Sequence, residues 1–163
     1  MITTAIQAEI VQRLAAITAG GTTPAGNTYA FTPTVVNGRR LLNTEGADGA
    51  VYSVQRGERI RNNRTPTGEQ NEYAVEYIVA GVVPISDYDN PALDAEKCIS
   101  DIAEALLEGD TVNERKRCTL GGLCEDFSFD SDTITQPDPD DVLISFSVTF
   151  AAILQGKRGY FYT

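Results

Sequence analysis

The sequence predicts an α+β fold in which a mostly antiparallel β-sheet carries two α-helices on one face and extends into a long hairpin arm. Two segments have apolar residues at helical spacing, and several others alternate apolar and polar residues as strands do. The strands also follow one another too closely for repeated crossover helices. With 163 residues, 42% of them apolar, the chain has the size and composition of a single domain spanning residues 1–163.

The first element is an amphipathic helix predicted for residues 4–19. Its start has the spacing of a capping box at Thr4 and Gln7, and its end carries Gly20 and Gly21, which can take the left-handed conformation that closes helices. The apolar residues recur every three or four positions, so they share one face that should pack on a core. These residues are Ile6, Ile10, Leu14 and Ile17.

Three strands are predicted next. Tyr29–Val36 carries aromatic and β-branched residues but is interrupted by Pro33, which favours the edge of a sheet. Ala50–Ile60 becomes polar toward its end and leads into Arg61–Gln70, a polar stretch predicted as an exposed loop or hairpin arm. Residues 72–85 alternate strictly and then become apolar on both faces, which indicates a central strand covered on both sides at that end.

A second helix is predicted to start at Asn90 and Pro91. Asparagine is a favoured N-cap, and proline at the first helical position loses no hydrogen bond. The helix is expected to stop at Gly109. Its apolar stripe consists of Ala95, Cys98, Ile99, Ile102, Ala103, Leu106 and Leu107.

The last third of the chain is predicted to hold two strands around an acidic loop. Arg115–Phe129 is expected to hold one strand that ends with Phe127 and Phe129 on one face, and Asp130–Asp141 is expected to be a loop punctuated by Pro137 and Pro139. Val142–Leu154 has the clearest strand pattern, because apolar residues occupy every second position and Ser or Thr residues lie between them.

Charge is distributed unevenly. The net charge is −10, yet residues 1–68 carry +3 and residues 69–163 carry −13, so the two parts are expected to face different partners. An acidic chain repels polyphosphate, which argues against reading DNA. No segment has the ~18 consecutive apolar residues of a membrane span, and no signal peptide is predicted, so the chain is expected to be soluble and to stay where it is made.

The residues offer little chemistry, and the protein is predicted not to be an enzyme and to need no cofactor. There is no histidine, which removes the common nucleophile and base pairs and every histidine-containing metal site. There is also no phosphate-binding glycine loop. Cys98, Cys118 and Cys124 are an odd number without metal-knuckle spacing, so they are interpreted as reduced, buried thiols.

The acidic loop is the main alternative site. Asp130 and Asp132 occupy the first and third positions of a calcium-loop pattern, but Ile134 stands where the next ligand is needed. A solvated loop is therefore favoured. A small domain that binds a metal or ligand through carboxylates, including Asp138 and Asp140, is the alternative from a different functional class.

Two groups of residues are candidate protein contacts. Four arginines concentrate positive charge in the arm, which is either solvated or docks on an acidic protein face. Three aromatic residues at the chain end either fold back on the core or contact a neighbouring subunit. The candidates are Arg56, Arg59, Arg61 and Arg64 in the arm and Tyr160, Phe161 and Tyr162 at the end.

This order of elements resembles that of the tail terminator, or tail completion, proteins of tailed bacteriophages. The resemblance rests on the capped N-terminal helix, the polar arm near residues 55–72, the helix after Asn90 and Pro91, and the closing strand with its aromatic tail. It covers nearly the whole chain. Compared with a minimal version of that fold, the arm at Arg56–Asn71 and the loop at Pro137–Pro139 are enlarged.

The resemblance implies a virion protein that is assembled in the host cytoplasm. It implies a ring, usually a hexamer, that sits on the last ring of the tail tube, ends polymerisation and joins the tail to the neck or head connector. Its partners would be copies of itself, the tail tube protein and connector proteins. DNA would pass through an acidic lumen without specific binding. A head-side connector or a tail-tube subunit is the structural alternative.

Overall fold

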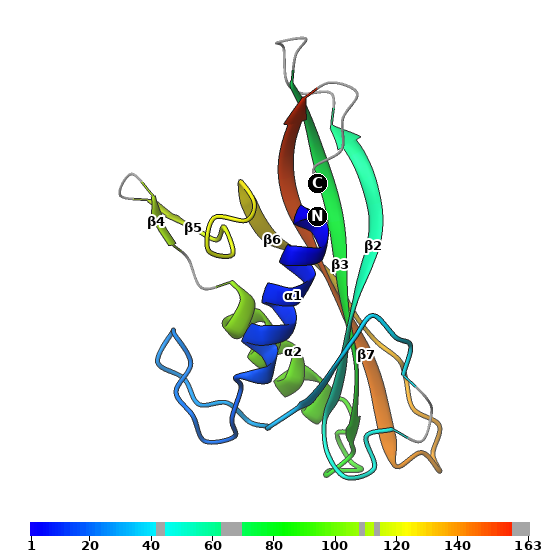
Figure 1. The fold of residues 1–163 in the computed structure, drawn as a ribbon. Helices are drawn as coiled ribbons and strands as arrows, with labels where there is room; N and C mark the ends of the chain where they lie inside the picture. Colours follow the sequence, from blue (N-terminus) through cyan, green and yellow to red (C-terminus); the bar gives the residue numbers. More distant parts are fainter. Residues whose placement is uncertain (42–44, 63–69, 108–109, 113–114, 158–163) are drawn as a thin grey trace.

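The computed structural model describes residues 1–41, 45–62, 70–107, 110–112 and 115–157, and it confirms the predicted fold class (Figure 1). Two helices pack on one face of a five-stranded, mostly antiparallel sheet, and a separate two-stranded ribbon lies beyond the helices. The elements are α1 (Ile2–Ala15), β1 (Thr34–Asn37), β2 (Val51–Asn62), β3 (Gln70–Pro84), α2 (Leu93–Leu106), β4 (Asp110–Val112), β5 (Arg115–Arg117), β6 (Asp126–Ile134) and β7 (Leu143–Lys157).

The sheet is built around the long antiparallel pair β3 and β7. Each of these strands has 15 residues, and they pair from Gln70 opposite Lys157 to Pro84 opposite Leu143. The order across the sheet is β1-β2-β3-β7-β6, so β1 and β6 are the edge strands. Only β1 runs parallel to its neighbour, pairing with the first four residues of β2.

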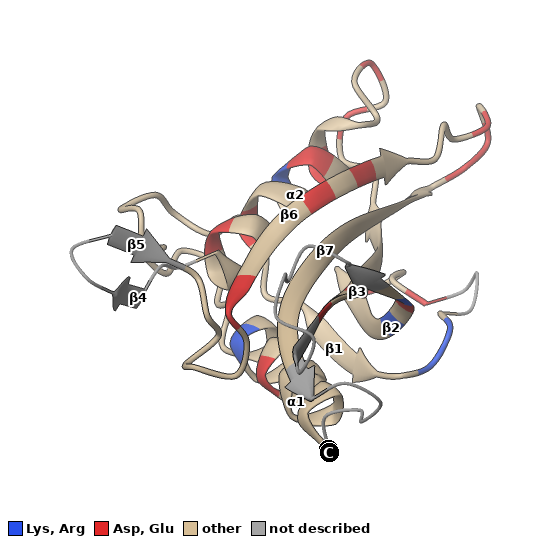
Figure 2. Ribbon diagram, turned by 90° about the horizontal axis from the view of Figure 1, so that it is seen from above, with Lys and Arg blue, Asp and Glu red and all other residues tan. Residues whose placement is uncertain are grey.

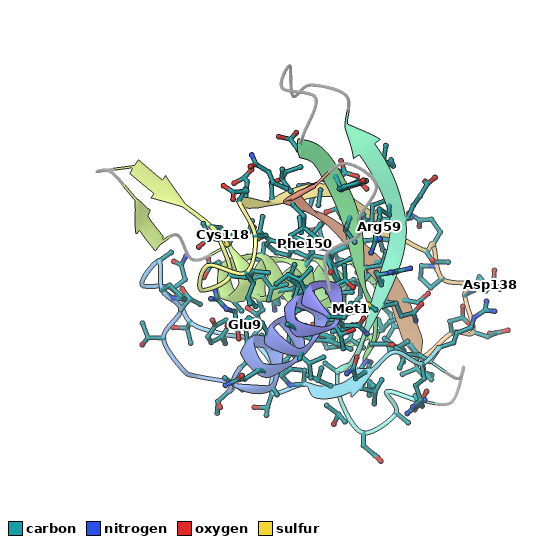
Figure 3. All side chains as sticks on the ribbon, turned by 45° about the horizontal axis from the view of Figure 1, so that its top comes forward. Met1, Glu9, Arg59, Cys118, Asp138 and Phe150 are labelled. Carbon is teal, nitrogen blue, oxygen red and sulfur yellow. The ribbon has the colours of Figure 1, made fainter. Side chains whose placement is uncertain are left out.

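One face of the sheet is apolar, and both helices cover it. Residues of β2, β3 and β7 at every second position are buried there, and Phe150 lies between the sheet and the helices (Figure 3). The α1 face that packs on them is the predicted one. The buried side chains of these elements include Tyr52, Val54, Val75, Tyr77, Val79, Ile144, Phe146, Val148, Phe150, Ala152 and Leu154 on the strands and Ile6, Ile10, Leu14 and Ile17 at the first helix.

The predicted capping box of the first helix is wrong. The helix α1 begins at Ile2, and no side chain caps its start. The side chain of Gln7 instead donates to Asn37 Oδ1 (2.6 Å) and to the carbonyl oxygen of Val54 (3.2 Å), because these acceptors on β1 and β2 lie within its reach. Gly20 has a positive φ of 81°, as expected for a turn, but it lies beyond the end of the helix at Ala15.

The second helix begins later than predicted. Asn90 and Pro91 lie in a turn before α2, and the N-cap is Ala92. Asp94, in the first helical turn, ties the start of α2 to the preceding loop. Its Oδ2 accepts hydrogen bonds from the backbone N–H (2.8 Å) and hydroxyl (2.6 Å) of Ser86. The predicted stop, Gly109, lies outside the described residues.

The predicted strand at Tyr29–Val36 is shorter than expected. Its edge position is confirmed, but only Thr34–Asn37 pairs, and it pairs in parallel with β2. The residues before it bond elsewhere: the backbone N–H groups of Ala30 and Phe31 donate to Asp101 Oδ2 at 2.9 and 3.4 Å. A carboxylate of α2 therefore replaces a sheet partner for this segment.

The strand predicted within Arg115–Phe129 is confirmed at its end, where Phe127 and Phe129 lie on one face of β6, but this range also contains β5, and the loop predicted for Asp130–Asp141 is wrong over its first five residues. Residues 110–112 and 115–117 pair as the ribbon β4–β5, and β6 runs from Asp126 to Ile134 along β7. Its residues 128–133 are all exposed. An edge strand needs only a neighbour for its backbone, so an acidic, solvent-facing sequence can form one without burying side chains.

The opposite face of the sheet is covered at the β1 end. Ser53 donates its hydroxyl to the carbonyl oxygen of Arg39, and Gly46 packs against Val82. This end of β3 is thus contacted on both faces, as the sequence predicted.

Replacing Gly81 tests the packing of the apolar face. A Cβ atom at this position would lie 2.2 Å from Phe146 Cζ, so Gly81→Ala must displace the ring. We expect the free energy of unfolding in urea to fall by about 1–3 kcal/mol. Combining Gly81→Ala with Phe146→Leu should cost less than the two single changes together, because the smaller side chain makes room. Additive losses would contradict this contact.

The pH dependence of stability tests Asp101. Burial raises its pKa above the ordinary 3.8, while the N–H groups of Ala30 and Phe31 oppose the shift. The folded chain therefore holds this proton to higher pH than the unfolded chain does, and the contribution of Asp101 to stability falls as pH rises through that window. Relative to Asp101→Asn, the free energy of unfolding of the unaltered chain should decline as the pH rises above 3.8, the ordinary pKa of this carboxyl. A relative increase would contradict the assignment.

Candidate protein interface

The three thiols of the chain are buried. Burial raises the pKa of Cys98 and of Cys124 to about 12, and the Cys118 thiol donates to the carbonyl oxygen of Leu106 (3.1 Å). A thiol is nucleophilic as the thiolate, so groups with such pKa values are unreactive near neutral pH. The structure therefore places the three cysteines as packing residues, in agreement with their interpretation from the sequence.

The other buried polar groups also serve the fold. Asp94 and Asp101 accept backbone hydrogen bonds from loops, as described above. Burial raises the pKa of Tyr52 far above its ordinary value, and Cys98 is the polar group beside its hydroxyl. Within the described residues this hydroxyl has no hydrogen-bond partner of ordinary geometry. A phenol held neutral in an apolar core packs well but is a poor acid or base near pH 7.

The four aspartates of the alternative metal site lie on different parts of the fold. Asp130 and Asp132 are on β6, whereas Asp138 and Asp140 lie in the turn before β7. Asp140 lines a hollow of about 640 Å³ together with Arg40 and other residues on the helix-free side of the sheet. Over the ranges that the structure describes, no group of three or more Cys, Asp or Glu side chains could hold a metal ion.

Among the described residues, two stretches on opposite sides of the sheet, here called its open edges, have no strand partner on their outer side and differ in charge. On β2, the partner strand β1 ends opposite Val54, so Gln55–Asn62 has β3 on one side and no strand of the described chain on the other. We call Gln55–Asn62 the basic edge, because it carries Arg56 and Arg59. Figure 2 shows blue on β2 and red bands along β6, with β3 and β7 between them.

The acidic edge is Phe129–Ile134 on β6. Earlier in the same strand, the backbone N–H of Phe127 donates to the carbonyl oxygen of Cys118 (2.8 Å). No strand of the described residues pairs with the outer side of Phe129–Ile134. Asp130 and Asp132 are exposed there, and neither forms an ion pair with a described residue. Phe129 is 44% exposed and makes an edge-to-face contact with Phe150 at 6.2 Å.

A β-bulge sets the direction of the two arginines. The register shifts between Arg56 and Arg59, so that Arg56 pairs with Tyr77 and Arg59 pairs with Val75. Both partners are buried on the helix-covered face, which places both arginines on that face. Without the bulge, residues three apart in a strand would point to opposite faces. The N–H of Glu58, freed by the bulge, donates to Glu76 Oε2 (3.3 Å).

The arginines lie near the phenol of Tyr77. Burial raises the pKa of Tyr77 to about 12, and the positive charges of Arg56 and Arg59 oppose that shift. The Tyr77 hydroxyl donates to the carbonyl oxygen of Thr3 (2.9 Å), which ties this part of the arm to the first turn of α1. Arg59 is half-buried and Arg56 is exposed; Figure 3 shows Arg59 on β2.

The other candidate contacts are placed only in part. Arg61 pairs with Tyr73 in the register, but its side chain lies outside the described residues. Arg64 and the aromatic tail, Tyr160, Phe161 and Tyr162, also lie outside the described residues. The sequence missed the acidic edge, because its residues were read as a loop.

The two open edges lie at the same height of the sheet. Arg56, Tyr77, Phe150 and Phe129 are register partners in succession, so they form one row across β2, β3, β7 and β6. In the next row on the same face, Asp132 is aligned through Val148 and Val79 with Val54, the residue two positions before Arg56. Opposite charges therefore mark the two ends of neighbouring rows.

Comparison with known proteins gives a likeness of fold to solved structures. No family model and no curated protein matches the sequence. A chain in the solved virion of a native gene transfer agent particle shares the fold with a TM-score of 0.51 and 14% sequence identity, over 95% of this chain and 98% of that chain. The likeness shows a common fold over nearly the full length of both chains. No helix in the described ranges is long and apolar enough to cross a membrane.

Thiol labelling tests the inertness of the cysteines. All three should react with a chromogenic disulfide reagent at least about tenfold more slowly in the folded chain than in urea, because all three are buried and burial raises the pKa of Cys98 and Cys124. Cys98→Ala, Cys118→Ala and Cys124→Ala, made singly, identify which thiol contributes each rate. Rapid labelling of one thiol in the folded chain would instead point to an activated nucleophile.

Proposed function

We propose that this chain is a structural protein of a phage-like virion and that it acts by binding other proteins and not by catalysis. The observation that carries this proposal is the fold it shares with a chain of a gene transfer agent virion, across 95% of its length. The residues are in keeping with it. The chain has no histidine, and the buried thiols and carboxylates that the structure describes pack the core or bond to backbone groups.

The finer proposal is a tail terminator. In this role the chain forms a ring, a hexamer by the sequence resemblance, on the last ring of the tail tube, ends polymerisation and joins the tail to the neck. One observation, together with a general rule of assembly, supports a ring. Each copy has two different open edges, and a contact between unlike surfaces closes into a ring when the rotation between copies allows it.

The charge of the chain is compatible with this role. A net charge of −10 disfavours binding to DNA, so DNA can pass a ring of such subunits without sticking. The arginines of the arm and the aromatic tail, including Arg61, Arg64, Tyr160, Phe161 and Tyr162, are proposed contacts with a neighbouring subunit or the tube. A head-side connector or tube subunit has the same general requirements, so the assembly product must separate them.

The mass of the purified chain in solution tests the proposal. A terminator should form a closed ring with a mass about six times the 17.6 kDa of one chain, and negative-stain images should show rings of uniform size. Light scattering over a concentration series, with imaging of the same samples, measures both. The ring should also stop growth when it is added to polymerising tail tubes.

Other products would point elsewhere. Long cylinders formed by the chain alone would identify a tube subunit, and rings that leave tube growth unchanged would favour a head-side connector. A monomer at every concentration would contradict the proposed ring.

A further inference from the structure

The positions of the two open edges bear on how a ring could close. Arg56 and Phe129 end the same row of the sheet, so a second copy can bring its acidic edge to the basic edge with little shift along the strands. A contact that repeats without such a shift favours a closed ring, whereas a contact with a large shift builds a helical filament. The register of this sheet therefore suits closure.

The side chains at the two edges also point to the same face. Arg56 and Arg59 lie on the helix-covered face of β2, because they pair with Tyr77 and Val75. On β6, Phe129 and Asp132 lie on that face as well, because they pair with Phe150 and Val148. Copies placed side by side in the same orientation would thus bring these groups together.

The chemistry of the edges is complementary. Arg56 is exposed and has no ion pair with a described residue, and the same holds for Asp130 and Asp132. Guanidinium groups bind carboxylates through directional, paired hydrogen bonds. The exposed ring of Phe129, in the row of Arg56, offers a guanidinium an aromatic face or edge in addition.

Both edges are also interrupted. The basic edge has its bulge between Arg56 and Arg59, and the acidic edge has a bulge at Asp130. Bulges break the regular spacing of backbone groups and are common where strands must not pair freely. The contact between copies is therefore expected to run through side chains and not through a continuous backbone ladder.

We propose that the ring closes head to tail, with Arg56 and Arg59 of one copy bound to Phe129, Asp130 and Asp132 of the next. This inference rests on the proposed ring, and it names the partner of the basic edge as a second copy of the same chain. Because the contact joins two different surfaces, every copy gives one edge and receives the other.

A charge swap tests the pairing directly. Arg56→Glu with Arg59→Glu places like charges at every contact, and so does Asp130→Arg with Asp132→Arg. Each pair should raise the concentration at which half of the chains are in rings by about tenfold or more. Carrying all four substitutions in one chain makes the edges complementary again, and rings should return.

Two further samples serve as controls. Asp138→Arg with Asp140→Arg changes the charge by the same amount as the β6 pair, but it lies outside the acidic edge and should leave the rings intact. Mixing the two reversed variants in equal amounts should restore rings in which they alternate. Thermal unfolding of each variant verifies that the fold is kept.

The outcomes separate this inference from the proposed function. If the unaltered chain forms rings and both reversed variants form them equally well, or if the four-substitution chain stays dissociated while folded, the head-to-tail pairing is wrong and the ring stands. Loss of rings in the control pair as well would overturn the pairing, because the effect would follow charge alone. If the unaltered chain forms no ring, the proposed function fails and the pairing falls with it.

Discussion

The difference in length between the strands and the helices governs this structure. A strand of 15 residues spans about 50 Å, whereas a helix of 14 residues spans about 21 Å. The two helices can therefore cover only part of the apolar face formed by β3 and β7, and Figure 1 shows the long strands continuing past the start of α1. The hydrogen bond from Tyr77 to Thr3 marks the level where α1 begins, and the arginines of the basic edge lie at this level. The exposed part of the arm is thus a consequence of helix length.

The sequence predicted the elements that bury side chains. The alternation in Val142–Leu154 identified β7, and the helical spacing of Ile6, Ile10 and Leu14 identified the buried face of α1. Both patterns arise because one face of the element leaves water. The same logic could not find β6 beyond Phe129, because its exposed residues 128–133 carry no pattern of burial. Their strand conformation depends on the neighbouring backbone, which a local pattern does not show.

From the sequence, only the composition of the candidate interface could be predicted, and not the arrangement of its side chains. The sequence showed that arginines gather in the arm, but their common direction depends on the bulge between Arg56 and Arg59. The alignment of Arg56 with Phe129 depends on three pairing registers at once, across strands that are far apart in the chain. Register is set by the turns and by the buried face together, so it becomes visible only once the sheet is assembled.

Unlike charge at the two edges also restricts which contacts can form. An acidic edge repels the acidic edge of another copy, so the symmetric pairing that would stop assembly at a dimer is disfavoured, and the same argument holds for two basic edges. Only the pairing of unlike edges gains from electrostatics, and that pairing leaves one free edge of each kind until the ring closes. In the proposed ring, closure would satisfy the last two edges at once, so a complete ring would be more stable than any open chain of the same subunits. A subunit with such edges would give a product of defined size, which is what a protein that ends a polymer requires.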